Sequence, residues 1–194
     1  MWRSIVISRI CVYCSSSNHV DPQYFEAAES LGRLIAGGSY QLVFGGGSLG
    51  LMGVLARAAK DKGGHIISVN LELFVKEGIN FEAADELIVS KTMNERKRIM
   101  AERSDAFIAL PGGFGTLEEL AEVLTLKQLH FHTKPIVIIN TKKYYDHLLK
   151  WLEHSYGESF VKERYRSLYH VTDNPSYAMK YIEEYKPVEL PVKW

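Results

Sequence analysis

The chain has 194 residues, 46% of them hydrophobic and 24% charged, and its 23 Lys and Arg are balanced by 23 Asp and Glu. This length and composition predict one globular domain with its own core and exclude a long disordered region. The zero net charge gives no reason to expect nucleic acid or an anionic membrane as a partner. No apolar run approaches the roughly 20 residues that span a bilayer, and Arg9 interrupts the short apolar run at the N-terminus, so we expect a cytoplasmic protein without a signal peptide.

Short β-branched runs alternate with segments of helical periodicity from one end of the chain to the other. This alternation is typical of a parallel sheet covered by helices on both faces, so we predict a Rossmann-like, doubly wound three-layer α/β fold in one domain over 1–194, with a tail at 186–194. The expected strands are Arg9–Tyr13, Gln41–Phe44, His65–Val69, Glu86–Val89, Ala106–Leu110 and Pro135–Ile139. The expected helices are Pro22–Gly37, Leu49–Lys62, Met93–Arg103, Leu117–His130, Lys143–Ser155 and Asn174–Glu184.

Two cysteines, Cys11 and Cys14, have the C-x-x-C spacing of thioredoxin-like motifs. Because this segment begins in a predicted strand, residues three apart lie about 10 Å from one another, beyond the roughly 7 Å that a disulfide tolerates. We therefore expect two free thiols in a reducing compartment.

A first glycine-rich loop follows the second strand and opens a helix. It begins Gly45-Gly46-Gly47-Ser48 and continues to Gly53. Glycines let the backbone approach an anion closely, and a helix start offers free N–H groups, so Gly46, Gly47 and Ser48 are candidate phosphate contacts. A tight turn with close helix packing is the alternative. The loop is not a Walker A motif, because no Gly-Lys-Ser/Thr follows.

A second loop with the same strand, glycine, helix order is Pro111-Gly112-Gly113-Phe114-Gly115-Thr116-Leu117-Glu118-Glu119. Thr116 and Glu119 fit the spacing of a capping box, and on spacing alone capping and catalysis are equally good explanations of Glu119. Helical periodicity puts one set of residues on a common face, which we assign to the core: Leu117, Leu120, Ala121, Leu124 and Gln128. Glu119 would then point away from the core, at the rim of an anion-binding loop. That placement favours a chemical role for the carboxylate.

A basic helix is predicted to start after Thr92, which forms a second capping box with Glu95. Helical periodicity places Arg96 inward and Arg98 on an ordinary solvated face. A cation near a helix N-terminus opposes the helix dipole, so an inward Arg96 needs an anionic partner. We favour a ligand over a structural ion pair, with Lys97 as a weaker candidate on the flank.

Three motifs taken together resemble the Lonely Guy family. They are Gly45-Gly46-Gly47 with Gly50-Leu51-Met52-Gly53, then Met93-x-x-Arg96-Lys97, then Pro111-Gly112-Gly113-x-Gly115-Thr116-x-x-Glu119, and the resemblance also takes in Cys14-Ser15-Ser16-Ser17. It implies a phosphoribohydrolase that cleaves a cytokinin riboside 5′-monophosphate, or AMP, into free base and ribose 5-phosphate. Related proteins carry a lysine decarboxylase label, but the sequence offers no independent sign of a pyridoxal phosphate site.

The resemblance also implies roles for particular residues. Arg96 and Glu119 would be the catalytic pair. The implied nucleotide contacts are Arg96, Lys97, Gly112, Gly113, Phe114, Gly115, Thr116, Leu117, Glu118 and Thr125. Thr125 fits, since it shares a polar helix stripe with Glu118 and Glu122. Two positions bear on the base preference. Asn94 stands where the family often has histidine, and Ser15 stands where glycine is common.

No cofactor or metal is expected, because the seven histidines are scattered and only His130 and His132 are close-set. Family members are typically dimeric, so we expect a homodimer. The apolar residues Leu126, Leu129, Phe131, Tyr144, Tyr145 and Trp151 exceed the obvious needs of one sheet face, although core packing is the commoner explanation. The alternative function is a non-catalytic nucleotide-binding or sensing module on the same fold.

Overall fold

The computed structural model describes residues 7–187. The N-terminal residues 1–6 and most of the expected tail, 188–194, lie outside the described residues. The strands are β1 (Arg9–Tyr13), β2 (Gln41–Phe44), β3 (Ile66–Leu71), β4 (Glu86–Ser90), β5 (Ala106–Ala109), β6 (Ile136–Ile139) and β7 (His170–Thr172). The helices are α1 (Pro22–Gly37), α2 (Gly50–Asp61), α3 (Glu72–Lys76), α4 (Met93–Glu102), α5 (Phe114–Gln128), α6 (Asp146–Gly157) and α7 (Pro175–Glu183), with 3-10 turns η1 (Thr141–Lys143) and η2 (Glu163–Leu168).

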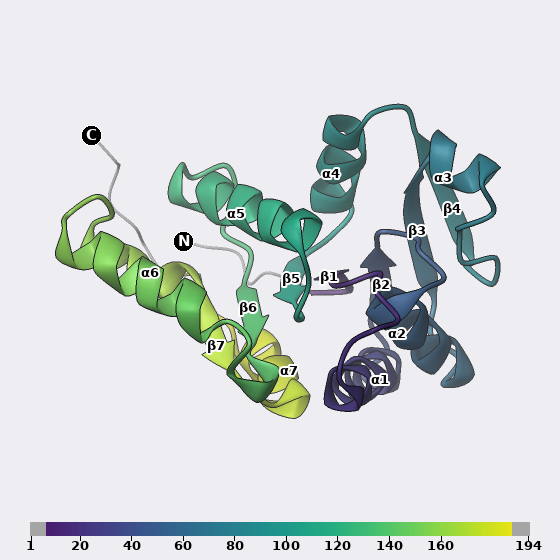
Figure 1. Ribbon diagram of the computed structural model, residues 1–194, viewed down its shortest axis with the longest axis horizontal. Helices are drawn as coiled ribbons and strands as arrows, with labels where there is room; N and C mark the ends of the chain where they lie inside the picture. The colour runs from purple at the N-terminus through teal and green to yellow at the C-terminus, as the bar shows by residue number, and fades with distance from the viewer. Residues whose placement is uncertain (1–6, 188–194) are drawn as a thin grey trace.

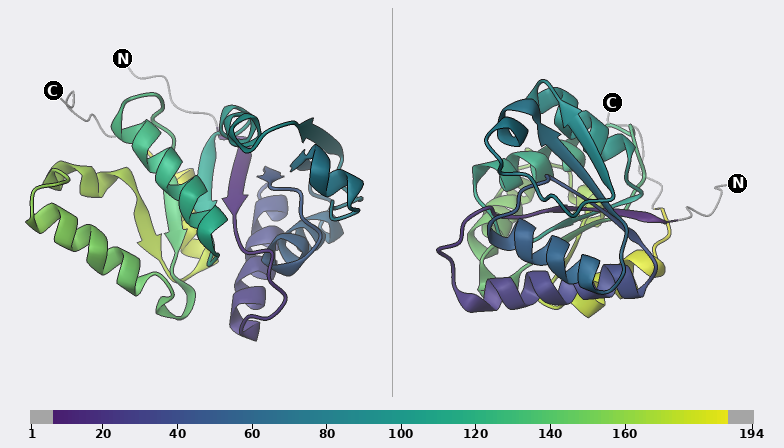
Figure 2. Two further views of the ribbon diagram at one scale, coloured as in Figure 1. Left: turned by 45° about the horizontal axis from the view of Figure 1, so that its top comes forward. Right: turned by 90° about the vertical axis from the view of Figure 1, so that its right-hand side faces the viewer.

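The strands form a parallel sheet in the order β4-β3-β2-β1-β5-β6-β7. Alternate residues of β1 supply the two cores: Ile10 and Val12 pack with α1, α2 and α7, whereas Cys11 and Tyr13 pack with α4, α5 and α6. Figures 1 and 2 show the sheet between these two helical layers. The predicted Rossmann-like α/β fold is confirmed. Among the helices of residues 7–187, none has the length and apolar character needed to cross a bilayer.

Local signals set the helix boundaries where the sequence places a cap. The Asp21 side chain accepts a hydrogen bond from Gln23 N at 3.0 Å, and α1 ends at Gly37 as predicted. Thr92 Oγ1 accepts from Glu95 N at 3.1 Å, but Glu95 Oε2 accepts from Lys91 N at 2.8 Å rather than from the Thr92 amide. The predicted box at α4 is therefore present, with its return bond shifted by one residue.

The second predicted capping box, at the start of α5, is wrong. The helix begins at Phe114 with Gly113 as its N-cap, three residues before the predicted start, so Thr116 already lies within the first turn. The predicted core face of this helix is also wrong. The residues that α5 buries are Thr116, Glu119, Leu120, Val123 and Lys127. Leu117, predicted to face the core, is 40% exposed.

One α-helix and one strand were not predicted. Helix α3 has five residues and buries none of their side chains. It therefore lacks the apolar periodicity from which a helix is predicted. Strand β7 has three residues at the edge of the sheet, all half-buried, which is too short for an alternating pattern. The other strands differ from prediction by at most two residues at an end.

The fold brings three loops together beside the central strand. The chain leaves β1 towards β2 on one side and later returns to β5 on the other, so the strand order reverses between β1 and β5, where ligands bind in such sheets. Ser15 N donates to Pro111 O at 3.2 Å, and Met52 N donates to Ser15 O at 3.2 Å. The loops after β1, β2 and β5 are thus joined to one another at the carboxyl edge.

Candidate active site

A cavity of about 350 Å³ opens where these loops meet. Its lining residues are Cys14, Ser15, Ser16, Ser17, Met52, Met93, Arg96, Gly113, Phe114, Gly115, Thr116 and Glu119. Six of these were predicted site residues: Arg96, Gly113, Phe114, Gly115, Thr116 and Glu119. The cavity therefore joins the N-terminus of α5 to the inward side of α4.

The N-terminus of α5 offers an anion site. No side chain caps this helix, and the first amides of a helix have no partner within it. Because Gly113, Phe114 and Gly115 line the cavity, those amides are available to a negatively charged group there. Gly112 cannot carry a side chain, since a Cβ would lie 2.1 Å from Thr116 Oγ1. Tyr144 Oη fixes this turn by donating to Gly112 O at 2.6 Å.

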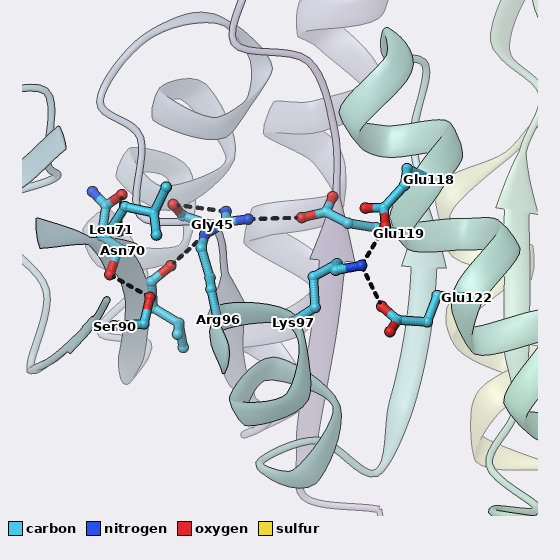
Figure 3. A network of polar contacts seen from close by, with 10 residues as sticks. Gly45, Asn70, Leu71, Ser90, Arg96, Lys97, Glu118, Glu119 and Glu122 are labelled. Carbon is cyan, nitrogen blue, oxygen red and sulfur yellow. Dashed lines mark hydrogen bonds and ion pairs between the residues drawn. The ribbon is translucent and has the colours of Figure 1, made fainter. Parts of the chain in front are cut away.

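Arg96 and Glu119 meet at the floor of the cavity. Arg96 Nη1 donates to Glu119 Oε1 at 2.9 Å, and the two residues are 7% and 8% exposed (Figure 3). The guanidinium is fixed by two backbone carbonyls, with Nε donating to Val69 O at 3.0 Å and Nη2 to Gly45 O at 3.1 Å. The inward orientation of Arg96 is confirmed, and its anionic partner in the chain is a carboxylate. The predicted outward position of Glu119 is wrong, because α5 buries a mixed face that includes Thr116 and Lys127, and not the apolar face assumed from the sequence.

Burial and charge act in opposite directions on Glu119. Desolvation raises the pKa of its carboxyl above the ordinary value, and the adjacent Arg96 guanidinium opposes that rise. Behind it, burial also raises the pKa of the Cys14 thiol, and the Glu119 charge adds to that effect. Cys11 and Cys14 are free and buried, as predicted. Glu119 is thus a carboxylate with one strong cationic partner and neutral groups behind it.

The first glycine loop is used mainly for packing. Gly46 has φ +78°, and a Cβ there would lie 2.4 Å from Ser68 Oγ. Its carbonyl accepts from Phe81 N at 2.8 Å, while Ser48 donates to Ile79 O through both N (3.0 Å) and Oγ (3.1 Å). Gly46 and Ser48 therefore lie outside the cavity lining, which fits the tight-turn alternative. Gly47 lines an adjacent pocket of about 290 Å³ that shares Arg96 with the main cavity.

Several other predicted contacts also lie outside the cavity lining. Lys97 binds carboxylates of α5 instead, Glu118 among them. Leu117 and Gly112 line a neighbouring apolar pocket of about 360 Å³. Thr125 is exposed, and its Oγ1 donates to Ala121 O of its own helix at 2.8 Å.

The family resemblance included the loop after β1, but sequence reasoning assigned none of its residues to the site. Ser15, Ser16 and Ser17 line the cavity, and Ser15 Oγ accepts from Ser17 N at 3.0 Å. Met52 and Met93 complete the wall. The available signal was position: this loop follows the central strand, next to the reversal of strand order where ligands bind.

The close-set histidines do not form a cluster for a metal. His132 Nε2 lies 3.0 Å from Val123 O, its ring packs 5.4 Å from that of Phe107, and burial lowers its pKa to about 4. In residues 7–187, no group of three or more His, Cys, Asp or Glu side chains is placed to hold a metal ion. His132 is a packed neutral histidine.

Fold and cavity together define a Rossmann-like α/β protein with its candidate active site at the carboxyl edge of the sheet. Residues 52–182 match the family described as "possible lysine decarboxylase". A "probable cytokinin riboside 5′-monophosphate phosphoribohydrolase" of Oryza sativa subsp. japonica is 42% identical, with 93% of this chain and 79% of the relative aligned. A cytokinin riboside 5′-monophosphate phosphoribohydrolase of Arabidopsis thaliana is 40% identical, with 92% and 84% aligned. The chain belongs to this phosphoribohydrolase family, the Lonely Guy family that its motifs indicated.

The fold likeness extends to a molybdenum cofactor binding protein from Rippkaea orientalis, with a TM-score of 0.71 and 24% identity over 93% of this chain and 98% of that one. That likeness supports the fold. The decarboxylase description is not matched by the cavity. Pyridoxal phosphate enzymes hold the cofactor on a lysine, and among the described residues that line the cavity there is no lysine.

Proposed function

We propose that this chain hydrolyses the N-glycosidic bond of a nucleoside 5′-monophosphate, a cytokinin riboside 5′-monophosphate or AMP, to free base and ribose 5-phosphate. The observation that carries the proposal is the buried Arg96–Glu119 pair, which lines the same cavity as the uncapped N-terminus of α5. Relatives at about 40% identity with that activity in their names support it.

The phosphate is assigned to the helix terminus. Backbone amides and the positive end of the helix dipole bind phosphate without any lysine. Gly113, Phe114, Gly115 and Thr116 supply that terminus. A Cβ added at Gly113 would meet no atom within 4 Å, so the space beside this residue is open to an anion. Binding energy from the phosphate then positions the bond that is cut.

The chemistry is assigned to Glu119. Breaking the bond between C1′ and the base nitrogen leaves the bonding electron pair on the base and positive charge on the sugar. The Glu119 carboxylate stabilises that charge and accepts a proton from the water that adds to C1′, and the departing base nitrogen takes up a proton from solvent. Release of the Glu119 proton to solvent then restores the carboxylate. Arg96 keeps the carboxylate ionised and in place, and its guanidinium holds the nucleotide.

Substituting either member of the pair tests this assignment. Glu119→Gln keeps the shape but removes the charge, so kcat for base release from AMP and isopentenyl-AMP should fall about a thousandfold. Arg96→Ala should lower it as strongly, because a buried carboxylate then loses its cation. Arg98→Ala is the control, since Arg98 is exposed and forms an ion pair with Glu102 of its own helix. Unchanged turnover in both site variants would refute the assignment.

The same assay separates the enzyme from a nucleotide-binding module. Hydrolysis predicts equal amounts of adenine and ribose 5-phosphate from AMP. Tight AMP binding by calorimetry with no base released by the wild type would instead favour a sensing module on this fold.

We propose further that the chain forms a homodimer through α5 and α6. Phe114 is 93% exposed, Trp151 60%, Tyr144 44% and Leu117 40%. Phe114, Leu117 and Tyr144 line an apolar pocket of about 360 Å³. Apolar groups of this size clustered on one face are typical of a protein interface. A second copy of the chain would cover them.

A cytoplasmic location is proposed on the basis of the cysteines. Cys11 and Cys14 are both free thiols. Free thiols that are not catalytic are the rule in reducing compartments. The balanced net charge supports a small nucleotide, rather than nucleic acid or a membrane surface, as the partner.

A further inference from the structure

Helices α4 and α5 are joined by two neighbouring sets of ion pairs (Figure 3). The inner set is Arg96 with Glu119, at 2.9 Å. In the outer set, Lys97 Nζ binds a carboxylate oxygen of Glu118 and lies 3.2 Å from Glu122 Oε2. Two consecutive basic residues of one helix therefore contact three acidic residues of the next.

Lys97 is the buried member of the outer set. Its side chain is 9% exposed, whereas those of Glu118 and Glu122 are 53% and 39% exposed. A buried ammonium stays charged only with acceptors around it, and the hydrogen bond to Glu118 is the main cause that raises the pKa of Lys97. Lys97 does not line the cavity that Arg96 lines. Its ammonium group is therefore directed at α5 and not at the cavity.

Glu119 is the group whose charge this arrangement affects. The titratable groups around it are Arg96 and Lys97 on α4, Glu118 on α5, and Cys11, Tyr13 and Cys14 on β1 and in the loop that follows. Burial raises the pKa of each of the last three, so they are neutral at neutral pH. The two cations lower the pKa of Glu119, and Glu118 raises it.

We infer that Lys97 is a positioning residue that compensates the acidic residues beside Glu119 and fixes α4 against α5, and that it is not a contact of the substrate. This inference rests on the proposed function, because it concerns the ionised state in which Glu119 reacts. Without Lys97, two carboxylates beside Glu119 lose their partner. Glu119 then holds its proton more tightly, and α4 loses a contact that places Arg96.

The pKa of Glu119 should shift upward in one variant and downward in another. In Lys97→Met, the acidic limb of the kcat profile for AMP should move to higher pH, since a rise of one unit in the pKa of Glu119 lowers its ionised fraction about tenfold below that pKa. In Glu118→Gln, removal of a like charge should move the limb to lower pH. The double variant Lys97→Met with Glu118→Gln should return it towards the wild-type position.

Two further variants separate charge from other causes. Lys97→Arg keeps the cation and should retain most of the wild-type profile. Arg98→Met removes one positive charge from an exposed site on the same helix, where the partner is Glu102, and should leave the profile unchanged. If Lys97→Met does not fold, Glu118→Gln still tests the inference, because it leaves Lys97 bonded to Glu122.

The titration of Glu119 gives a readout that is independent of turnover. It can be monitored in each variant by NMR of the ¹³C-labelled carboxyl group. The predicted result is a higher midpoint in Lys97→Met, a lower one in Glu118→Gln and compensation in the double variant. An increase in KM for AMP with unchanged kcat profile and no compensation would show a substrate contact and overturn the inference. Unchanged midpoints in both single variants would also overturn it.

Wild-type protein that releases no base would refute the proposed function, while the NMR midpoints would still test the charge compensation.

Discussion

The protonation state of Glu119 is the residue-scale property on which the chemistry depends. Its pKa is raised by burial and lowered by Arg96. The ionised form stabilises a cationic sugar and the protonated form does not, so kcat should fall as the pH decreases through the raised pKa. A pH–rate profile under saturating AMP measures this limb. A flat profile from pH 8 to pH 4 would contradict the role of the carboxylate.

His132 makes a separate prediction about stability. Burial lowers its pKa from 6.5 to about 4, so the unfolded chain takes up the proton first as the pH falls. Stability that is present above pH 6.5 is therefore lost between that pH and pH 4, by at most about 3 kcal/mol. His132→Phe should remove this loss, at a cost of about 1 kcal/mol at pH 7 for the contact with Val123 O. Urea unfolding from pH 7 to pH 4.5 checks it, and parallel curves for the two proteins would contradict it.

The orientation of single residues could be predicted from the sequence only where the helix buries the face that its residue pattern indicates. Arg96 was placed inward because helical periodicity puts it on one face with Met100, and α4 buries both. Glu119 was placed outward because apolar residues such as Leu117 and Leu124 were assigned to the core, whereas the face that α5 buries also contains Thr116 and Lys127. The bonds of Lys97 to α5 depend on how two helices approach, which no local pattern in the sequence encodes.

At the scale of elements, the loops that form the cavity are packed closely against one another. Gly50 has φ +60°, its N donates to Asn18 Oδ1 at 2.8 Å, and a Cβ there would lie 2.3 Å from the Ser16 carbonyl carbon. Helix α2 therefore meets the loop after β1 backbone to backbone. A side chain at this point would separate two of the loops that form the site.

Gly50→Ala should destabilise the protein by about 2 kcal/mol or more, from a strained left-handed backbone and a backbone clash. It should also weaken AMP binding, because the serines of the loop after β1 line the cavity. Gly37→Ala is the matched control. Gly37 is the last residue of α1, and a Cβ added there would have no neighbouring atom within 4 Å, so this substitution should change stability by less than about 1 kcal/mol. Equal stability of the two variants in urea would contradict the account.

The elements that position the site were predictable because each has a strong local signal. The central strands are continuous buried apolar runs, and α1 and α4 have side-chain caps. Helix α3 and strand β7 were not predictable, since both are short and neither has a buried face. The phosphate role expected of the first glycine loop stays a prediction, and the sequence alone could not show that Gly46 also serves close packing against Ser68.

At the scale of the whole molecule, the exposed aromatic residues on α5 and α6 bear on assembly. Light scattering should give about twice the 22.0 kDa of one chain. Trp151→Glu places a charge on α6 outside the cavity and should yield a monomer. Tyr177→Glu is the control, because Tyr177 is 63% exposed but lies on α7, in the opposite helical layer. A monomeric wild type, or a dimer unaffected by Trp151→Glu, would contradict this interface.

The most direct test of the whole account is a crystal structure of the Glu119→Gln variant with AMP, in which the bond should remain uncleaved. We expect the phosphate on the amides of Gly113 to Thr116 and the anomeric carbon beside the side chain at position 119, with Arg96 in contact with the nucleotide. AMP bound outside this cavity, or with its ribose remote from Arg96 and position 119, would contradict the account.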